Sequence, residues 1–338
     1  MNLKGIIYCA PPKITARVIA AILALLLALA AFKISDSLIK ADTENEDQDA
    51  VESEELNGGK ETESPKRDVF NAEGAISVGA VVNGSSAFLC NLTDSAVIAE
   101  KNCYEKVSAR DATVFMVALT VSKAINEGRV NLTDEAVCPA SAAKFPNYKL
   151  SEEVLPIGKR MKIGDILKCM LYQSGSSYAY TLAVHISGSE EAFVSEMNAY
   201  CANLKLSETS FVSCTGDEAV SGTISAYDLA AILKAALSEP LIRGIICSDD
   251  MITVGYGQSG SVNLVVKNDF FESYCTESQA KNDGIIGGKV GAFGYNRWSA
   301  ILFSRDGKDY LSLVLDSNDA FADGLMLYTA YVLSVSGG

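Results

Sequence analysis

Several serine and lysine side chains stand at spacings that could support nucleophilic chemistry. Ser141 and Lys144 lie three residues apart, so a lysine amine one helical turn away could take the proton of the serine hydroxyl. Further along, Ser174-Gly175-Ser176 provides two more hydroxyls, and Lys289-Val290-Gly291 follows a pair of glycines. A serine nucleophile activated by a base would indicate acyl transfer. The elements that carry these residues decide whether they can meet.

The order of predicted elements indicates an α+β domain. Short apolar runs predict strands at both ends of the domain, and helical periodicity predicts helices between them. Strands followed by helices and then by strands favour a largely antiparallel sheet flanked by helices, with a helical cluster inserted into it. The predicted strands are 76–82, 87–92, 95–99, 261–267, 285–291, 298–304 and 310–315, and the predicted helices are 111–127, 165–173, 176–187, 189–204, one from Ser225, and 319–333.

Residues 1–40 are typical of an export signal or membrane anchor. Three basic residues precede an uncharged apolar run from Val18 to Phe32. The run is short for a membrane span, but apolar residues continue beyond it to Ile39, so we expect a retained anchor with its N-terminus inside. The rest of the chain would then be extracytoplasmic, and the protein would be secreted if the signal were cleaved.

Residues 41–68 predict a disordered acidic linker. The net charge of the 338-residue chain is −14, and ten acidic residues stand against two lysines between positions 42 and 66. Such a segment cannot bury enough apolar surface to offset the entropy of ordering. Residues 69–338 remain as one folded domain of moderate negative charge. That charge disfavours nucleic acid as a partner.

The cysteines and the single histidine give no indication of a metal centre. Eight cysteines follow the apolar run; their even number permits disulfides in an exported protein without establishing them. His185 stands among apolar residues of a predicted helix, so we expect an ordinary helical residue and neither a metal nor another cofactor. The Gly287-Gly288-Lys289 run lacks the serine or threonine of a phosphate-binding loop.

The chain from about 75 to 335 resembles the D-alanyl-D-alanine carboxypeptidases, low-mass penicillin-binding proteins related to class A β-lactamases. Several local sequences match in register over about 200 residues. They are Asn91-x-x-Asp94-Ser95-x-Val97-Ile98-x-Glu100-Lys101-Asn102, Lys162-Ile163-Gly164-Asp165-Ile166-Leu167 ahead of Ser174-Gly175, Ala183-x-x-Ile186-x-Gly188-Ser189-x-x-x-Phe193-Val194-x-x-Met197-Asn198, Thr209-x-Phe211 with Thr215-Gly216, and Gly287-Gly288-Lys289. The resemblance implies a β-lactamase/transpeptidase-like fold.

The resemblance also implies three catalytic motifs, of which little remains in this chain. In the family, a Ser-x-x-Lys motif supplies the nucleophile and its base, a Ser-x-Asn motif relays protons and holds substrate, and a Lys-Thr-Gly motif binds the terminal carboxylate. Carried over, the nucleophile and base positions hold Asp111 and Val114. The asparagine and threonine positions hold Ser176 and Val290. The residues that match, and are therefore candidates for ligand binding, are Ser174, Lys289 and Gly291.

Two residues could in principle replace the missing nucleophile. Asp111 is one, but carboxylate attack on an amide would form an anhydride more reactive than the substrate. Ser141 with Lys144 is the other, since it matches Ser-x-x-Lys literally. Ser141 stands 33 residues before Ser174, whereas the family needs about 60, and Pro146 would interrupt the helix expected after a nucleophile. We therefore interpret Ser141 as a loop residue and the motif as a decoy.

The altered motif positions predict an electrostatic contact. The resemblance places the third-motif lysine beside the nucleophile, so Lys289 should lie near Asp111. An ion pair between them would plug the cleft.

The sequence therefore predicts an exported, membrane-tethered pseudoenzyme with a carboxypeptidase-like domain. It would act by binding a peptidoglycan stem peptide or an envelope protein. The alternatives are an active or residually active serine-type D-alanyl-D-alanine carboxypeptidase in peptidoglycan maturation, and a purely structural domain. Many family members carry a β-rich C-terminal domain and a trailing membrane helix; the chain ends soon after its last predicted helix, so we expect tethering through the N-terminus. The oligomeric state stays open.

Overall fold

The computed structural model describes residues 69–79, 81–145, 155–216, 222–256, 262–276, 280, 282–293 and 296–333. These residues all belong to one unit, Ser64–Gly338. The predicted anchor at 1–40 and the predicted linker at 41–68 lie outside the described residues. Within the described ranges, no helix is both long enough and apolar enough to cross a membrane.

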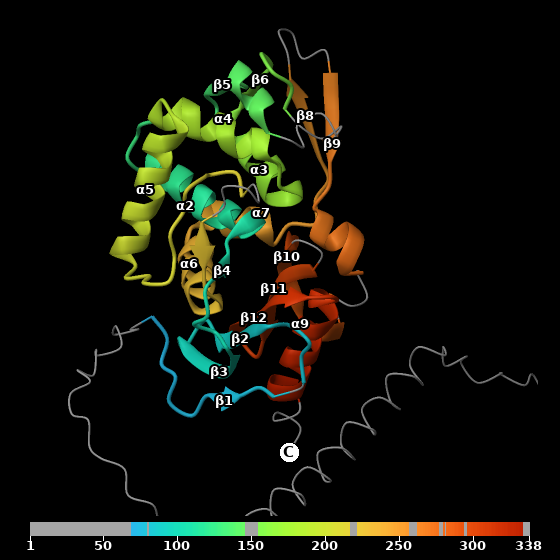
Figure 1. Ribbon diagram of the computed structural model, residues 1–338. Coiled ribbons are helices and arrows are strands. Elements are labelled where there is room, and N and C mark those ends of the chain that lie inside the picture. Colours follow the sequence, from blue (N-terminus) through green and yellow to red (C-terminus); the bar gives the residue numbers. More distant parts are fainter. Residues whose placement is uncertain are drawn as a thin grey trace, which may run out of the picture. The chain divides into compact units, whose positions relative to one another are not determined.

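The centre of the domain is a six-stranded sheet with the strand order β1-β3-β2-β12-β11-β10 (Figure 1). Strands from the start of the domain meet strands from its end, because β2 pairs with β12. The pairings are antiparallel except for the short parallel pairing of β1 with β3, so the predicted largely antiparallel sheet is confirmed. The strands are β1 (Ile76–Ser77), β2 (Ser86–Asn91), β3 (Ala96–Lys101), β10 (Ile285–Phe293), β11 (Asn296–Arg305) and β12 (Lys308–Ser317).

Three small two-stranded sheets and the helices complete the described structure. The small sheets pair β4 (Val107–Ser108) with β7 (Thr223–Ile224), β5 (Glu135–Val137) with β6 (Arg160–Lys162), and β8 (Ile252–Tyr256) with β9 (Val262–Val266). The helices and helical turns are η1 (Arg110–Ala112), α2 (Thr113–Asn126), η2 (Ala140–Lys144), α3 (Ile163–Gln173), α4 (Ser176–Ser187), α5 (Glu190–Asn203), α6 (Ala226–Ser238), α7 (Pro240–Ile246), η3 (Phe270–Tyr274), α9 (Ala320–Tyr328) and η4 (Thr329–Leu333).

Both faces of the main sheet are covered. On one face, Phe88 and Leu302 join the core cluster formed with helices α2 to α7, and α6 lies against β2 and β12. On the other face, their neighbours Leu89 and Phe303 pack with α9. Successive strand residues point to opposite faces, so the central strands β2, β11 and β12 of this three-layer arrangement carry apolar residues on both sides. The same alternation decides which residues of β10 can reach the helical cluster.

Local signals predicted the helices well. The predicted helix 111–127 is α2, and 176–187 is α4 with the same bounds. The Ser225 hydroxyl accepts a hydrogen bond from the backbone NH of Asp228 (3.1 Å), and Ser189 caps α5 in the same way (3.2 Å). Each cap satisfies one of the NH groups that a helix start leaves without a partner.

One predicted extent was wrong, and one helix was missed. The strand expected over 76–82 comprises only Ile76–Ser77, because the chain leaves the sheet so that Asn83 and Gly84 can bond to α9. The helix α7 was not predicted, although Pro240 at its first turn is a typical start signal.

Asp323 of α9 anchors this departing segment. Its side chain is 3% exposed and accepts hydrogen bonds from the backbone NH groups of Asn83 (2.9 Å) and Gly84 (3.1 Å) and from the Ser317 hydroxyl (2.7 Å). All three bonds go to Oδ2, and Oδ1 accepts a further bond from the side-chain amide of Asn83 (3.3 Å).

We expect Asp323→Asn to lower the free energy of unfolding by about 1–2 kcal/mol. The amide oxygen can take the place of Oδ2, but it is uncharged and accepts the three bonds more weakly, and the amide NH2 then faces the Asn83 side-chain amide, which loses its acceptor. Urea denaturation of both proteins measures the change. Asp319→Asn is the matched control, since Asp319 caps α9 from an exposed position and asparagine caps equally well. Equal losses in the two variants would contradict the anchoring role.

Candidate functional site

Asp111 lies in the turn η1, which leads directly into the buried helix α2. This turn packs against β10. The preceding residue, Arg110, has a positive φ of 41°, a conformation that L-residues other than glycine rarely adopt. Val114, one turn further on, is 4% exposed and belongs to the main core cluster. The position that the resemblance assigns to a base is therefore an apolar core position.

Lys289 projects from β10 into the interface with the helical cluster. It stands opposite Ala300 in the sheet, on the face covered by the helices, and it is 5% exposed. Its Nζ donates a hydrogen bond to the carbonyl oxygen of Leu171, in the last turn of α3 (3.0 Å). The lysine thus ties the edge strand β10 to the helical cluster.

Burial disfavours the positive charge of Lys289, and two nearby carboxylates favour it. Burial lowers the pKa of Lys289 from 10.5 to about 8, and the carboxylates of Asp111 and then Asp269 oppose this shift. Asp111 thus acts on Lys289 with the predicted sign, while a direct ion pair between them stays a prediction. Two features were not predicted: the hydrogen bond to Leu171 and the second acid, Asp269, which lies between β9 and η3.

Ser174 and Ser176 occupy the tight connection between α3 and α4. Ser174 ends α3 with φ +66°, Gly175 follows with φ +133°, and Ser176 begins α4. A serine with a positive φ is a strained residue, and such residues persist where the surrounding structure enforces them. Leu171, whose carbonyl oxygen accepts the hydrogen bond from Lys289, stands three residues before Ser174.

Val290 and Gly291 have packing roles. Val290 stands opposite Ser299 in the sheet and packs on the α9 side, away from Lys289. Gly291 stands opposite Trp298, and a Cβ at position 291 would lie 2.2 Å from the indole Nε1. Glycine is therefore required here so that the buried Trp298 ring can lie against the strand.

We expect Gly291→Ala to lower the free energy of unfolding by about 1–3 kcal/mol without any ligand present. The added methyl group would overpack a fully buried ring. Denaturant titration with tryptophan fluorescence measures this, since Trp298 is the single tryptophan. Gly79→Ala is the control for a glycine-to-alanine change without overpacking, since its Cβ would meet nothing within 4 Å and, as at Gly291, φ lies outside the left-handed region. A loss no larger than that of the control would contradict the packing role.

Ser141 and Lys144 lie on the turn η2 and are engaged in other contacts. The Tyr180 hydroxyl donates to the Ser141 hydroxyl (3.0 Å). Lys144 pairs with Glu190 of α5 (2.8 Å), and this hydrogen bond raises the pKa of Lys144. A lysine with a raised pKa stays protonated and is a poor base. These contacts favour the interpretation of Ser141-x-x-Lys144 as a decoy.

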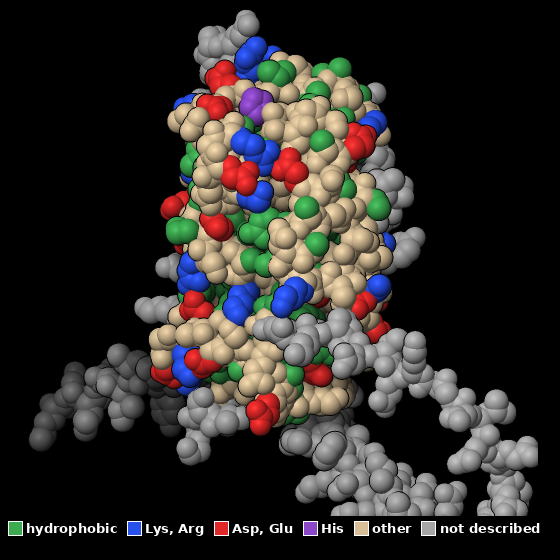
Figure 2. Space-filling view, turned by 90° about the vertical axis from the view of Figure 1, so that its left-hand side faces the viewer, with side chains coloured by type: hydrophobic (Ala, Val, Ile, Leu, Met, Phe, Trp, Pro, Cys, Tyr) green, Lys and Arg blue, Asp and Glu red, His purple; other side chains and the backbone are tan. Residues whose placement is uncertain are grey.

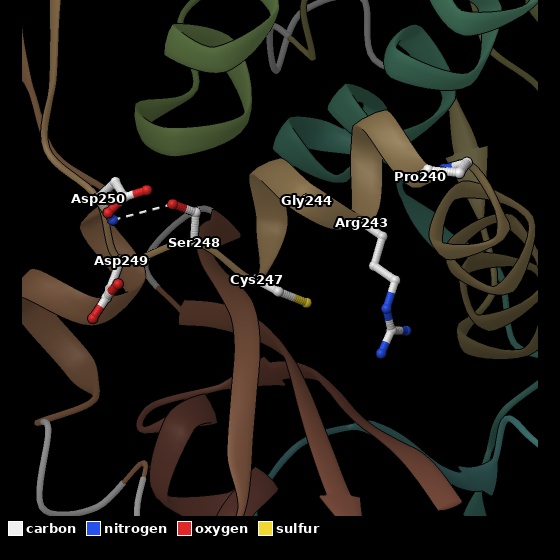
Figure 3. Close-up of a pocket in the computed structure, with 7 residues that line it drawn as sticks. All are labelled: Pro240, Arg243, Gly244, Cys247, Ser248, Asp249 and Asp250. Atoms are coloured by element: carbon white, nitrogen blue, oxygen red, sulfur yellow. Dashed lines mark hydrogen bonds between the residues drawn. The ribbon is translucent and has the colours of Figure 1, made fainter.

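A separate hollow lies at α7 and the segment that follows it. It has a volume of about 580 Å³ and is lined by Pro240, Arg243, Gly244, Cys247, Ser248, Asp249 and Asp250 (Figure 3). The Arg243 guanidinium is paired with Asp309 (2.8 Å). None of the three motif positions lines this hollow, so the described hollow is distinct from the candidate site.

The histidine and cysteines have no clustered arrangement within the described ranges. His185 is exposed, and on the face shown in Figure 2 basic and acidic side chains are interspersed. The eight described cysteines are free thiols; seven are buried and Cys247 is partly buried. Across the described part of the chain, no group of three histidine, cysteine or acidic residues could hold a metal ion.

Sequence comparison decides the family. A family model described as D-alanyl-D-alanine carboxypeptidase matches residues 74–284. The chain belongs to this family. Among curated members, the D-alanyl-D-alanine carboxypeptidase DacF of Bacillus subtilis is 32% identical over 152 residues, which are 45% of this chain and 38% of DacF. DacC of Escherichia coli is 28% identical over 173 residues, 50% of this chain and 43% of DacC. The chain thus matches about two fifths of the length of these carboxypeptidases.

Solved structures show the same fold for this D-alanyl-D-alanine carboxypeptidase family member. A mutant of the Streptomyces K15 DD-transpeptidase aligns with a TM-score of 0.62 at 20% identity and covers 73% of this chain and 97% of the transpeptidase. Penicillin binding protein 6B of Escherichia coli gives 0.62 at 20% identity, with 74% and 77% covered. The predicted fold is confirmed.

In this family member, the fold brings some motif positions together and separates others. The turn that carries Asp111 packs against β10, and Lys289 of β10 bonds to the last turn of α3, which precedes Ser174. Val114 and Val290 turn into the two cores. Asp269 and the Leu171 carbonyl carried no sequence signal, because their part in the site depends on contacts between residues far apart in the chain.

Proposed function

We propose that this chain is an exported, membrane-tethered member of the carboxypeptidase family that has lost acyl transfer and acts by binding. Its partner would be a peptidoglycan stem peptide or an envelope protein. The basic-then-apolar order of residues 1–40 supports the location. The residues substituted at the motif positions, which are Asp111, Val114, Ser176 and Val290, support the loss of acyl transfer.

One observation carries the loss of chemistry. The turn η1 presents the carboxylate of Asp111, and the first turn of α2 carries the buried Val114. A peptidase of this kind needs a hydroxyl and a base there, and the members of such a unit act together. Losing them costs about 10⁶ in turnover. The lysine that remains, Lys289, donates a hydrogen bond to the carbonyl oxygen of Leu171, and its charge is attracted by Asp111 and Asp269.

Labelling with a fluorescent penicillin tests this proposal. We expect no covalent adduct with the purified full-length chain, while an active D-alanyl-D-alanine carboxypeptidase labelled in parallel gives a stoichiometric one. The reason is that penicillins acylate the nucleophilic serine, which this chain lacks at position 111. A stoichiometric adduct would contradict the proposal. If Ser141→Ala then removed the adduct, the nucleophile would be Ser141 and the chain an unconventional enzyme.

A further inference from the structure

Glu190, in the first turn of α5, holds two other segments of the chain through its carboxylate. Its side chain is 12% exposed. One oxygen, Oε2, pairs with Lys144 of η2 (2.8 Å). The other, Oε1, accepts hydrogen bonds from the Ser213 hydroxyl (2.7 Å) and from the backbone NH of Cys214 (3.3 Å). Hydrogen bonds to an ionised acceptor are stronger than neutral ones, so Glu190 ties both buried residues to α5.

The tied segment continues to Gly216, which lies against the turn that carries Asp111. The Ser213 hydroxyl accepts a hydrogen bond from the backbone NH of Thr215 (3.1 Å), which fixes the path between the two contacts. A Cβ at position 216 would lie 2.3 Å from the carbonyl oxygen of Arg110 and 3.0 Å from the backbone nitrogen of Asp111. The two backbones therefore touch, and glycine, here with φ +74°, permits the approach.

The turn that Gly216 touches needs support from its surroundings. Arg110 has a φ of 41°, and residues in this conformation persist where the neighbouring structure enforces it. The supporting segment is held by two side chains of α5. Asn198 bonds to the backbone NH and carbonyl of Phe211 (2.8 Å each), and Glu190 holds the residues next along the chain, closer to Gly216.

From these contacts we infer that Glu190 is a positioning residue for the turn that carries Asp111. It acts through Ser213, Cys214 and Gly216, and none of its described contacts is with a motif position. Loss of its carboxylate would free the segment, and the Asp111 carboxylate would then move relative to Lys289. The face formed by η2 and the start of α5 is thereby coupled to Lys289 through a chain of touching elements.

The pKa of Lys289 reports where the Asp111 carboxylate lies, because that carboxylate opposes the lowering by burial. We expect Glu190→Ala to lower this pKa below its value of about 8, by at least about half of the shift that Asp111→Asn produces, since one nearby negative charge moves away. An NMR titration of the full-length chain with isotope-labelled lysine ε-carbons measures the pKa. The Lys289 signal is assigned by its absence in Lys289→Met.

A conservative variant separates the loss of hydrogen bonds from the loss of charge. In Glu190→Gln, the amide oxygen can take the place of Oε1 and keep the bonds to Ser213 and Cys214. The NH2 group then replaces Oε2, and Lys144, which is half exposed, can turn to water. We therefore expect Glu190→Gln to leave the pKa of Lys289 close to that of the unsubstituted chain.

Glu196→Ala is the matched control on the same helix. Glu196 also accepts a hydrogen bond from a serine hydroxyl, that of Ser187 (2.6 Å), and pairs with a cation, Arg129 (2.7 Å). None of its described contacts reaches residues 213–216. We expect no change in the pKa of Lys289 in this variant.

Several results would overturn the inference. One is an unchanged pKa of Lys289 in Glu190→Ala or in Asp111→Asn. Another is a shift in Glu196→Ala or in Glu190→Gln as large as that in Glu190→Ala, which would indicate a general loosening or a direct charge effect. If a thermal melt shows that Glu190→Ala does not fold, Ser213→Ala takes its place with the same expected direction, because it removes the shortest bond from this segment to Glu190 and keeps the charge.

Discussion

Restoring all four motif positions is expected to create a penicillin-reactive protein. The variant Asp111→Ser, Val114→Lys, Ser176→Asn, Val290→Thr should form a covalent adduct, while the unsubstituted chain forms none. The framework supports this expectation because η1 already packs on β10 and the charge of Asp111 already acts on Lys289. A serine at position 111 would therefore stand at the cleft, one helical turn before its lysine. The expected gain in acylation rate is up to about 10⁶.

Partial restoration separates recovered chemistry from a general loosening of the fold. Asp111→Ser alone should remain unreactive, because a serine without a base is a weak nucleophile and the motif members act together. Time courses of labelling, with mass spectrometry of the adduct, distinguish the two proteins. A single-substitution variant that labels as fast as the quadruple variant would contradict this cooperative account. If the quadruple variant folded but stayed unlabelled, the segments that carry the three motifs would not be in the positions that catalysis needs.

Lys289 is expected to make stability depend on alkaline pH. Its folded pKa of about 8 lies below its ordinary value of 10.5. Between these two values the unfolded chain binds more protons, so the Lys289 contribution to the free energy of unfolding rises as pH increases from 8 to 10.5. Below pH 8 the burial penalty is constant, and above 10.5 it is gone. The gain over this window is about 3 kcal/mol, since each pKa unit is worth about 1.36 kcal/mol.

A variant without the amine isolates this effect from other titrating groups. Burial raises the pKa of several thiols, for example those of Cys169 and Cys201, from 9.0 to about 12. The contribution of these thiols to the free energy of unfolding therefore falls as pH rises above 9, which overlaps the range of the Lys289 effect. Lys289→Met keeps an unbranched side chain of similar length and removes the titrating amine. Urea denaturation of both proteins at pH 7 and pH 10.5 should show the unsubstituted chain gaining about 3 kcal/mol relative to the variant. If the free energies of unfolding of the two proteins changed with pH in parallel, the lowered pKa of the buried Lys289 ammonium would be contradicted.

The predicted elements succeeded where the signal was local. The helical periodicity of 111–127 and the helix start at Ser225 each depend on residues within a few positions of one another, and both helices formed as expected. The short strands β4 to β7 were missed. Each has two or three residues and pairs with a partner remote in sequence, as β4 does with β7. Pairings of this kind leave no periodic pattern to read.

For the candidate site, likewise, the motif positions were predicted and the long-range contacts were not. The positions of Asp111, Ser174 and Lys289 followed from the spacing of the motifs, and the attraction between Asp111 and Lys289 followed from their charges. The hydrogen bond to Leu171 and the part played by Asp269 did not. The direction of Val290, toward α9, depends on the register of β10 with β11, which is a property of the assembled sheet.

The amino-acid sequence by itself determined the family, the order of the elements and the loss of a hydroxyl and an amine from the motif positions. These are properties of residue type and spacing along the chain. Only the tertiary structure decided what became of the lysine that remained. A buried ammonium must find acceptors and countercharges in the space around it. That space is formed by η1, the end of α3, the segment before η3, and β10, which meet only when the domain is folded.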